Sequence, residues 1–176
     1  MNQVQQAILD AVLKASPRPQ AILDIGCGNA SFTQVMASVL PGTRVTGLDL
    51  AYPKRAVPAG IKFVMGCVEV LPFGAESFDV LTASKSLHHW DDKDKGLAEA
   101  YRVLKKGGWL VIGDPLIQGW LENRFAKWLV PLLDSGSISV YGELVAALKG
   151  AGFESIDITM IPHSLKSLFL IVARKP

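Results

Sequence analysis

The chain has 176 residues, of which 49% are hydrophobic and 19% charged, a composition that excludes an intrinsically disordered chain. Its formal net charge of +2 is too small to indicate a nucleic-acid partner, and no apolar run reaches the roughly 20 residues that a membrane-spanning helix needs. The length fits a single domain over residues 1–176.

The apolar pattern predicts strands and helices that alternate along the chain. In chain order we expect helix 4–14, strand 21–25, helix 31–40, strands 43–48, 61–65 and 78–83, helix 91–104, strand 109–113, an amphipathic segment 120–133, helix 141–149, and strands 156–161 and 167–173. Asp91 or Asp92 is expected to cap helix 91–104. Residues 105–108, two lysines and two glycines, are expected to end that helix.

Strands that alternate with helices are typical of a parallel sheet covered by helices on both faces. The predicted fold class is therefore α/β, with a doubly wound, mostly parallel sheet whose last strand runs antiparallel. The last two strands follow each other closely enough to pair antiparallel, although Pro162 lies between them. Ligands of such sheets bind beyond the carboxyl ends of the strands, where the strand order reverses.

The stretch AILDIGCGNASF, residues 21–32, contains a glycine loop (residues 24–28) directly after a buried strand. Glycines such as Gly26 and Gly28 let the backbone approach a ligand closely. Asp49 ends the next strand, about 20 residues further on, where an acidic residue can bind both hydroxyls of a ribose. This spacing favours a ligand that contains adenosine.

Other nucleotide motifs match the glycine loop less well. A dinucleotide fingerprint, G-x-G-x-x-G, needs a third glycine where this chain has Ser31, which weakens but leaves open a nicotinamide or flavin ligand. A phosphate loop would need Gly-Lys-Ser/Thr, and the glycine loop is not followed by it.

Four motifs follow one another along the chain: LDIGCGNASF, VTGLDL, LPFGAESFDVLTASKSLHHW and AYRVLKKGGWLVIGDP. In this order they resemble the S-adenosylmethionine-dependent methyltransferases of the seven-stranded (class I) type, above all the small-molecule group that includes quinone-biosynthesis enzymes. The resemblance covers residues 21–115 well and the rest of the chain in outline. It implies a seven-stranded Rossmann-like sheet and S-adenosyl-L-methionine as the cofactor.

The resemblance also implies cofactor-binding residues, which are Asp24, Gly26, Cys27, Gly28, Asp49, Leu50, Cys67, Val68 and Ser84. In the family pattern the glycine loop shapes the pocket for the methionine end, Asp49 binds the ribose, and Leu50 packs near the adenine. Cys67 and Val68 lie in the loop that reads the adenine edge. Ser84 lies where backbone groups meet the amino group of the cofactor.

Two residues depart from the family pattern. Ala30 replaces a third glycine, and we expect its small methyl group to cost little. Cys67 replaces an acid that often hydrogen-bonds the adenine amino group, and a thiol is a poor substitute. We therefore expect either weaker cofactor affinity or an adenine held by backbone groups and apolar packing.

His88 and His89 are the candidate catalytic residues. A histidine beside the cofactor would accept a proton from a substrate hydroxyl or an acidic carbon, and the alternative is that one histidine packs within the fold while the other is exposed. The two histidines and the two cysteines, Cys27 and Cys67, lack metal-ligand spacing, so no metal is predicted. The cysteines also show no disulfide pattern, and the N-terminal residues do not resemble a signal peptide, so we expect a cytoplasmic location.

Trp120 and Trp128 lie on a wide apolar face of segment 120–133. Packing over the sheet is the ordinary role of such a face. A cover over a lipophilic acceptor, a homodimer contact and a contact with a membrane surface are the alternatives.

We therefore predict methyl transfer from S-adenosylmethionine to a small, unidentified acceptor, which is lipophilic in one interpretation. TASKSLHH stands where an N-P-P-Y-like sequence would follow the fourth strand, which disfavours methylation of exocyclic nitrogens of bases or glutamine. Two alternatives remain open. Cys67 and the short segment 51–60 favour a degenerate cofactor-binding partner subunit that does not catalyse methyl transfer. A nicotinamide-dependent oxidoreductase is the second alternative, provided that the missing third glycine is tolerated.

Overall fold

The computed structural model describes residues 1–53, 56–57, 60–114, 136–161 and 168–176. The elements in these ranges are α1 (Gln3–Ala15), β1 (Ala21–Ile25), α2 (Ser31–Val39), β2 (Arg44–Asp49), β3 (Lys62–Met65), β4 (Phe78–Ser84), the 3-10 turn η1 (Leu87–His89), α3 (Lys93–Val103), β5 (Leu104–Asp114), α5 (Gly136–Gly150), β6 (Glu154–Ile161) and β7 (Leu168–Arg174).

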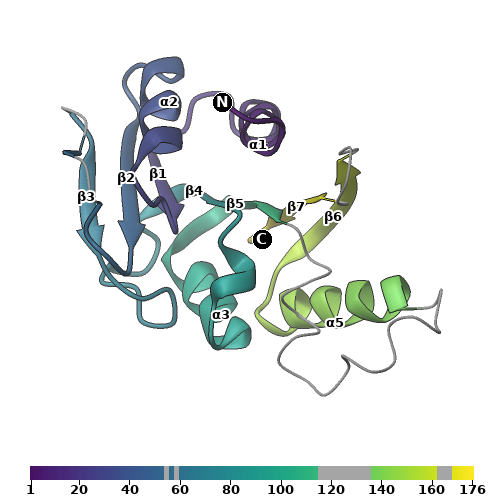
Figure 1. Cartoon of the computed structure of the whole chain (residues 1–176). Coiled ribbons are helices and arrows are strands. Elements are labelled where there is room, and N and C mark those ends of the chain that lie inside the picture. Colours follow the sequence, from purple (N-terminus) through teal and green to yellow (C-terminus); the bar gives the residue numbers. More distant parts are fainter. Residues whose placement is uncertain (54–55, 58–59, 115–135, 162–167) are drawn as a thin grey trace.

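The strands form one seven-stranded sheet in the order β3-β2-β1-β4-β5-β7-β6 (Figure 1). Strands β1 to β5 pair in parallel, whereas β7 runs antiparallel to both of its neighbours, β5 and β6. The strand order reverses between β1 and β4, because the chain builds outward from β1 to β3 and then crosses back. The predicted mostly parallel sheet with an antiparallel last strand is confirmed.

Helices cover both faces of this sheet, as the alternation of the sequence predicted (Figure 1). Val80 and Val111 lie in one buried apolar cluster with residues of α1 and α2. Their chain neighbours Leu81 and Leu110 lie in a second cluster, which includes residues of α3 and α5. Since successive side chains of a strand point to opposite faces, strands that are apolar throughout can fill both clusters.

The expectation that residues 105–108 end a helix is wrong. Helix α3 ends at Val103, and β5 begins at once with Leu104, which lies opposite Phe78 of β4. Lys105 donates a 2.8 Å hydrogen bond to Asp79, so this lysine serves β4 rather than a helix end. Gly107, in the left-handed region at φ 76°, belongs to a stretch of β5 where the register with β4 shifts.

Asp92, one of the two expected caps, does cap α3. Its side chain accepts a 3.0 Å hydrogen bond from the backbone N–H of Lys95, in the first turn of the helix. The cap of this helix was therefore predicted correctly and its end within one residue, whereas residues 105–108 belong to β5.

The amphipathic segment 120–133, with Trp120 and Trp128, lies outside the described residues. In the ranges that are described, no helix is long and apolar enough to cross a membrane.

Candidate functional site

The glycine loop lies at the point where the strand order reverses, and its backbone is held against the end of β2. The N–H groups of Gly26 and Cys27 both donate to the carbonyl oxygen of Leu48, at 2.8 and 3.1 Å. Gly26 has a φ of +69°, and a Cβ built on it would lie 2.4 Å from Cβ of Ser86. Only glycine therefore fits between the loop and the segment that follows β4.

Asp49, the last residue of β2, connects this strand to the glycine loop. Its Oδ2 accepts a 2.8 Å hydrogen bond from the backbone N–H of Gly28, and its Oδ1 accepts from Ala51 at 3.3 Å. A carboxylate has about four acceptor positions, so both oxygens keep capacity for a further donor such as a ribose hydroxyl.

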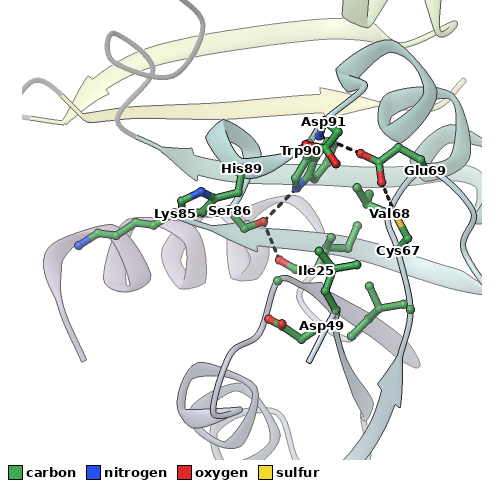
Figure 2. Close-up of a pocket in the computed structure, with 14 residues that line it drawn as sticks. Ile25, Asp49, Cys67, Val68, Glu69, Lys85, Ser86, His89, Trp90 and Asp91 are labelled. Atoms are coloured by element: carbon green, nitrogen blue, oxygen red, sulfur yellow. Dashed lines mark hydrogen bonds between the residues drawn. The ribbon is translucent and has the colours of Figure 1, made fainter. Parts of the chain in front are cut away.

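A cavity of about 330 Å³ opens beside Asp49 at the carboxyl ends of the strands (Figure 2). Its wall is mainly apolar, with Ile25, Leu48, Val68 and Trp90 among the lining residues. Polar side chains interrupt this apolar surface, namely those of Asp49, Cys67, Glu69, Lys85, Ser86, His89 and Asp91. A cavity with a mainly apolar surface and polar groups placed along it is typical of a small-molecule site.

Five of the predicted cofactor-binding residues line this cavity: Gly26, Asp49, Leu50, Cys67 and Val68. The other four, which are not among its lining residues, are Asp24, Cys27, Gly28 and Ser84. Ser84 is the last residue of β4, one position before the lining residues Lys85 and Ser86.

Asp24 has a structural role at the start of the glycine loop. Its side chain is buried and accepts hydrogen bonds from the hydroxyl groups of Thr33 on α2, at 2.7 Å, and Thr82 on β4, at 3.0 Å. Burial raises the pKa of this carboxyl from 3.8 to about 6, although both threonines act in the opposite direction. Asp24 thus ties β1 to two neighbouring elements.

Cys27 holds an unreactive thiol. Burial, and then the nearby charges of Asp24 and Asp49, raise its pKa to about 12. A thiol with such a pKa stays protonated at neutral pH and is a weak nucleophile.

The expectation that alanine at position 30 has little free-energy cost relative to glycine is wrong. Ala30 has a φ of 58°, in the left-handed region, and it stands at the N-cap of α2 without a side-chain hydrogen bond. Alanine pays about 1 kcal/mol or more for this conformation, which a glycine adopts freely. The cost lies in the backbone, and the size of the methyl group alone does not reveal it.

Glu69 is a cavity residue that sequence reasoning missed. The Cys67 thiol donates to its Oε2, while its Oε1 accepts from the backbone N–H groups of Asp91, at 3.0 Å, and Asp92, at 3.3 Å. Burial alone would raise the pKa of Glu69, but these hydrogen bonds lower it overall. The hydrogen bond to Glu69 in turn raises the pKa of Cys67. Cys67, which stands where the family often has an acid, is therefore hydrogen-bonded to an acid two residues later. The presence of Glu69 at that spacing is the feature of the sequence that could have indicated its role.

Ser86 and Trp90 are two further cavity residues that were missed. The Ser86 hydroxyl donates to the carbonyl oxygen of Ile25 at 3.0 Å and accepts from Nε1 of Trp90 at 3.2 Å (Figure 2). These bonds fasten the loop after β4 to the end of β1, across the reversal of the strand order. No residue pattern in SKSLHHW distinguishes them in advance.

The two histidines lie in η1, directly after this loop. Their rings are in contact, with centroids 3.9 Å apart. His89 lines the cavity, whereas Nδ1 of His88 lies 2.9 Å from Oδ1 of Asp114, a fully buried carboxyl at the end of β5. Burial raises the pKa of Asp114 despite the opposing attraction of His88. Asp114 was assigned no role from the sequence.

Strand order, glycine loop and cavity together define an α/β protein with a candidate small-molecule site at the carboxyl edge of its sheet. The profile of the family described as "methyltransferase domain" matches residues 23–112, from β1 to β5. The chain belongs to this methyltransferase family, and the family predicted from the sequence is confirmed.

Individual relatives agree with this family. The chain is 33% identical over 160 residues to the O-methyltransferase cnsE of Penicillium expansum, a match that covers 82% of this chain and 56% of the relative. It is 36% identical over 104 residues to a demethylmenaquinone methyltransferase of Chlorobaculum tepidum, covering 57% and 43%. The chain thus spans about half the length of these curated relatives.

Solved structures share the fold. The chain resembles the 1,6-didemethyltoxoflavin-N1-methyltransferase of Burkholderia thailandensis, with a TM-score of 0.71 and 20% identity, over 98% of this chain and 78% of the other. At this level of identity the likeness shows the fold alone.

Proposed function

We propose that the chain transfers a methyl group from S-adenosylmethionine to a small acceptor. The observation that carries this proposal is the cavity at the reversal of the strand order, with the Asp49 carboxylate and the glycine loop at one end of it. The family of the chain and the names of its relatives, which are methyltransferases, support the same activity.

The chemistry of the lining residues fits this cofactor. Asp49 would accept hydrogen bonds from the two ribose hydroxyls, and the apolar side chains of Leu50 and Val68 would pack against the adenine. Leu50 is 70% exposed, so a flat apolar ring has an uncovered surface to bind. The missing Cβ of Gly26 lets the glycine loop lie against Ser86 beside the cavity, where the loop would face the methionine end of the cofactor.

When bound, the cofactor supplies a methyl group on a sulfonium, which is already a good leaving group. The protein therefore contributes mainly alignment and a cavity from which water is excluded. The apolar wall around Ile25, Leu48 and Trp90 serves the second purpose. The acceptor would approach from the side of β4 and β5, where His89 lines the cavity.

Calorimetric titration with S-adenosylmethionine and S-adenosylhomocysteine tests this function. We expect saturable binding that Asp49→Ala weakens tenfold or more, which corresponds to about 1.4 kcal/mol. Asp10→Ala, which removes an exposed carboxylate on α1 instead, is the matched control and leaves binding unchanged.

The other outcomes separate the alternatives. A folded chain that binds neither compound contradicts the proposal and favours a partner subunit without catalysis. Preferential binding of a reduced nicotinamide dinucleotide favours an oxidoreductase.

A further inference from the structure

His88 and Asp114 form a hydrogen-bonded pair that the proposed function leaves unused. Nδ1 of His88 lies 2.9 Å from Oδ1 and 3.2 Å from Oδ2 of Asp114. Asp114 is fully buried, while the His88 side chain keeps 24% of its surface exposed. An ionised carboxylate only accepts hydrogen bonds, so it selects the form of the ring with the proton on Nδ1 and leaves Nε2 as an acceptor.

The backbone around this pair keeps the two side chains together. The N–H of Lys85 donates a 2.7 Å hydrogen bond to the carbonyl oxygen of Gly113, which joins the loop after β4 to the end of β5. Leu87, the first residue of η1, is buried in the core. The backbone N–H groups of Leu87 and His88 also interact with the Asp114 carboxyl and act to lower its pKa, although burial is the larger effect and raises the pKa overall.

The pair adjoins the proposed cofactor cavity. The His88 ring is in contact with the ring of His89, and His89 lines the cavity. Asp114 and His88 lie at the carboxyl ends of β5 and β4, on the other side of the strand reversal from Asp49 at the end of β2. Asp49 and the histidine–aspartate pair thus lie on opposite sides of the strand reversal, and the pair reaches the cavity through the ring of His89.

On the basis of the proposed methyltransferase function, we propose that His88 is the general base and that Asp114 is its positioning residue. The acceptor then carries an acidic proton on a hydroxyl group or a carbon. A buried carboxylate behind a histidine orients the ring and stabilises the imidazolium that forms on proton uptake. A neutral amine offers a free lone pair, so an amine acceptor gives this pair no necessary role.

The methyl transfer involves only the acceptor, the cofactor and His88. The acceptor oxygen or carbon forms a bond to the methyl carbon as its own proton passes to Nε2 of His88. The electron pair of the broken carbon–sulfur bond remains on sulfur, which becomes a neutral thioether. The imidazolium, stabilised by Asp114, later releases the proton to water.

Nitrogen NMR of the cofactor-free chain tests the pair without any acceptor. The chain has three histidines, so His88→Gln, His89→Gln and His163→Gln assign the ring signals. In the neutral His88 ring we expect the proton on Nδ1, and we expect Asp114→Asn to abolish that preference because an amide can donate to Nδ1 as well. Asp157→Asn, at an exposed position of β6, leaves the ring unchanged. A wild-type ring with its proton on Nε2 overturns the proposal.

Turnover with a panel of phenols, enols and aromatic amines tests the acceptor class. We expect methylation of hydroxyl or carbon acceptors, and a kcat that falls by about 100-fold or more in His88→Gln with little change in KM. Methylation confined to amines, or an unchanged kcat in His88→Gln, overturns the proposal.

Calorimetry on the same variants keeps the two proposals apart. His88→Gln and Asp114→Asn should bind S-adenosylhomocysteine as the wild type does, because neither residue lines the cofactor cavity. A wild-type chain that does not bind this compound contradicts the proposed function, while the position of the ring proton is measured independently of it.

Discussion

Among the glycines that the structure describes, Gly26 combines the shortest steric contact with a left-handed backbone. A Cβ there would lie 2.4 Å from Cβ and 2.6 Å from Oγ of Ser86, and its φ of +69° disfavours any side chain. Gly28, two residues later, has a similar φ of +55°, but a Cβ at this position would have no atom within 4 Å. The two glycines therefore separate the cost of a steric clash from the cost of backbone conformation.

Gly26→Ala should lower the free energy of unfolding by about 2–4 kcal/mol, because the new methyl group forces Ser86 away from Ile25 and strains the backbone. Gly28→Ala should cost about 1 kcal/mol, from conformation alone. Urea unfolding of both variants measures the difference. Equal losses would show that the contact with Ser86 does not constrain the glycine loop.

At the residue scale, local spacing in the sequence was sufficient to predict that Asp49 lies beside the glycine loop. Asp49 follows a strand at a fixed distance from the glycine loop, and it does contact that loop through Gly28. Asp114 was not predicted, because its partner His88 lies on another strand's loop and meets it only once β4 and β5 have paired. Contacts between distant residues depend on the sheet, which no local pattern contains.

At the scale of elements, the Asp24 carboxylate joins β1 to α2 and β4 through two threonine hydroxyls. Its pKa is about 6 in the folded chain against an ordinary value of 3.8, so the folded state binds this proton more tightly than the unfolded state. The cost of burying the charge is therefore absent well below pH 3.8 and complete above about pH 6.

Asp24→Asn should stabilise the chain relative to the wild type at pH 8, on the order of 2–3 kcal/mol, and give no such gain near pH 4. An asparagine keeps hydrogen-bonding groups for both threonines but carries no charge. Urea unfolding between pH 4 and pH 8 measures this difference, with Asp157→Asn as an exposed control. A gain that does not depend on pH would mean that the charge of Asp24 is not what burial penalises.

The element boundaries show where local signals are insufficient. Most predicted helices and strands lie within a few residues of those observed, because their apolar faces point to one of two buried clusters. Residues 105–108 were assigned to a helix end from their lysines and glycines. In the structure they extend β5, since Lys105 bonds to Asp79 and Gly107 donates to the carbonyl oxygen of Lys175. Pairing with neighbouring strands overrode the local signal.

At the scale of the whole molecule, one topological feature organises the site. The strand order reverses between β1 and β4, and the loop after β4 meets the end of β1 there through the hydrogen bond from Ser86 to Ile25. Asp49 lies on one side of this reversal, and His88 with Asp114 lies on the other. The fold thus separates a candidate position for a nucleoside from a candidate position for a proton acceptor.

The alternation of strands and helices was sufficient to predict this architecture, because a mostly parallel sheet with helices on both faces buries strands that are apolar throughout. The acceptor could not be predicted in the same way. Its recognition depends on side chains that converge from several loops, and their arrangement follows from tertiary packing.

The most direct test of the proposed cofactor site is a crystal structure of the chain with S-adenosylhomocysteine. We predict that both ribose hydroxyls bind the Asp49 carboxylate, that the adenine lies against Leu50 and Val68, and that the sulfur atom lies on the side of β4 and the histidines. A ligand bound elsewhere, or a ribose that does not contact Asp49, would contradict the assignment of this cavity to the cofactor.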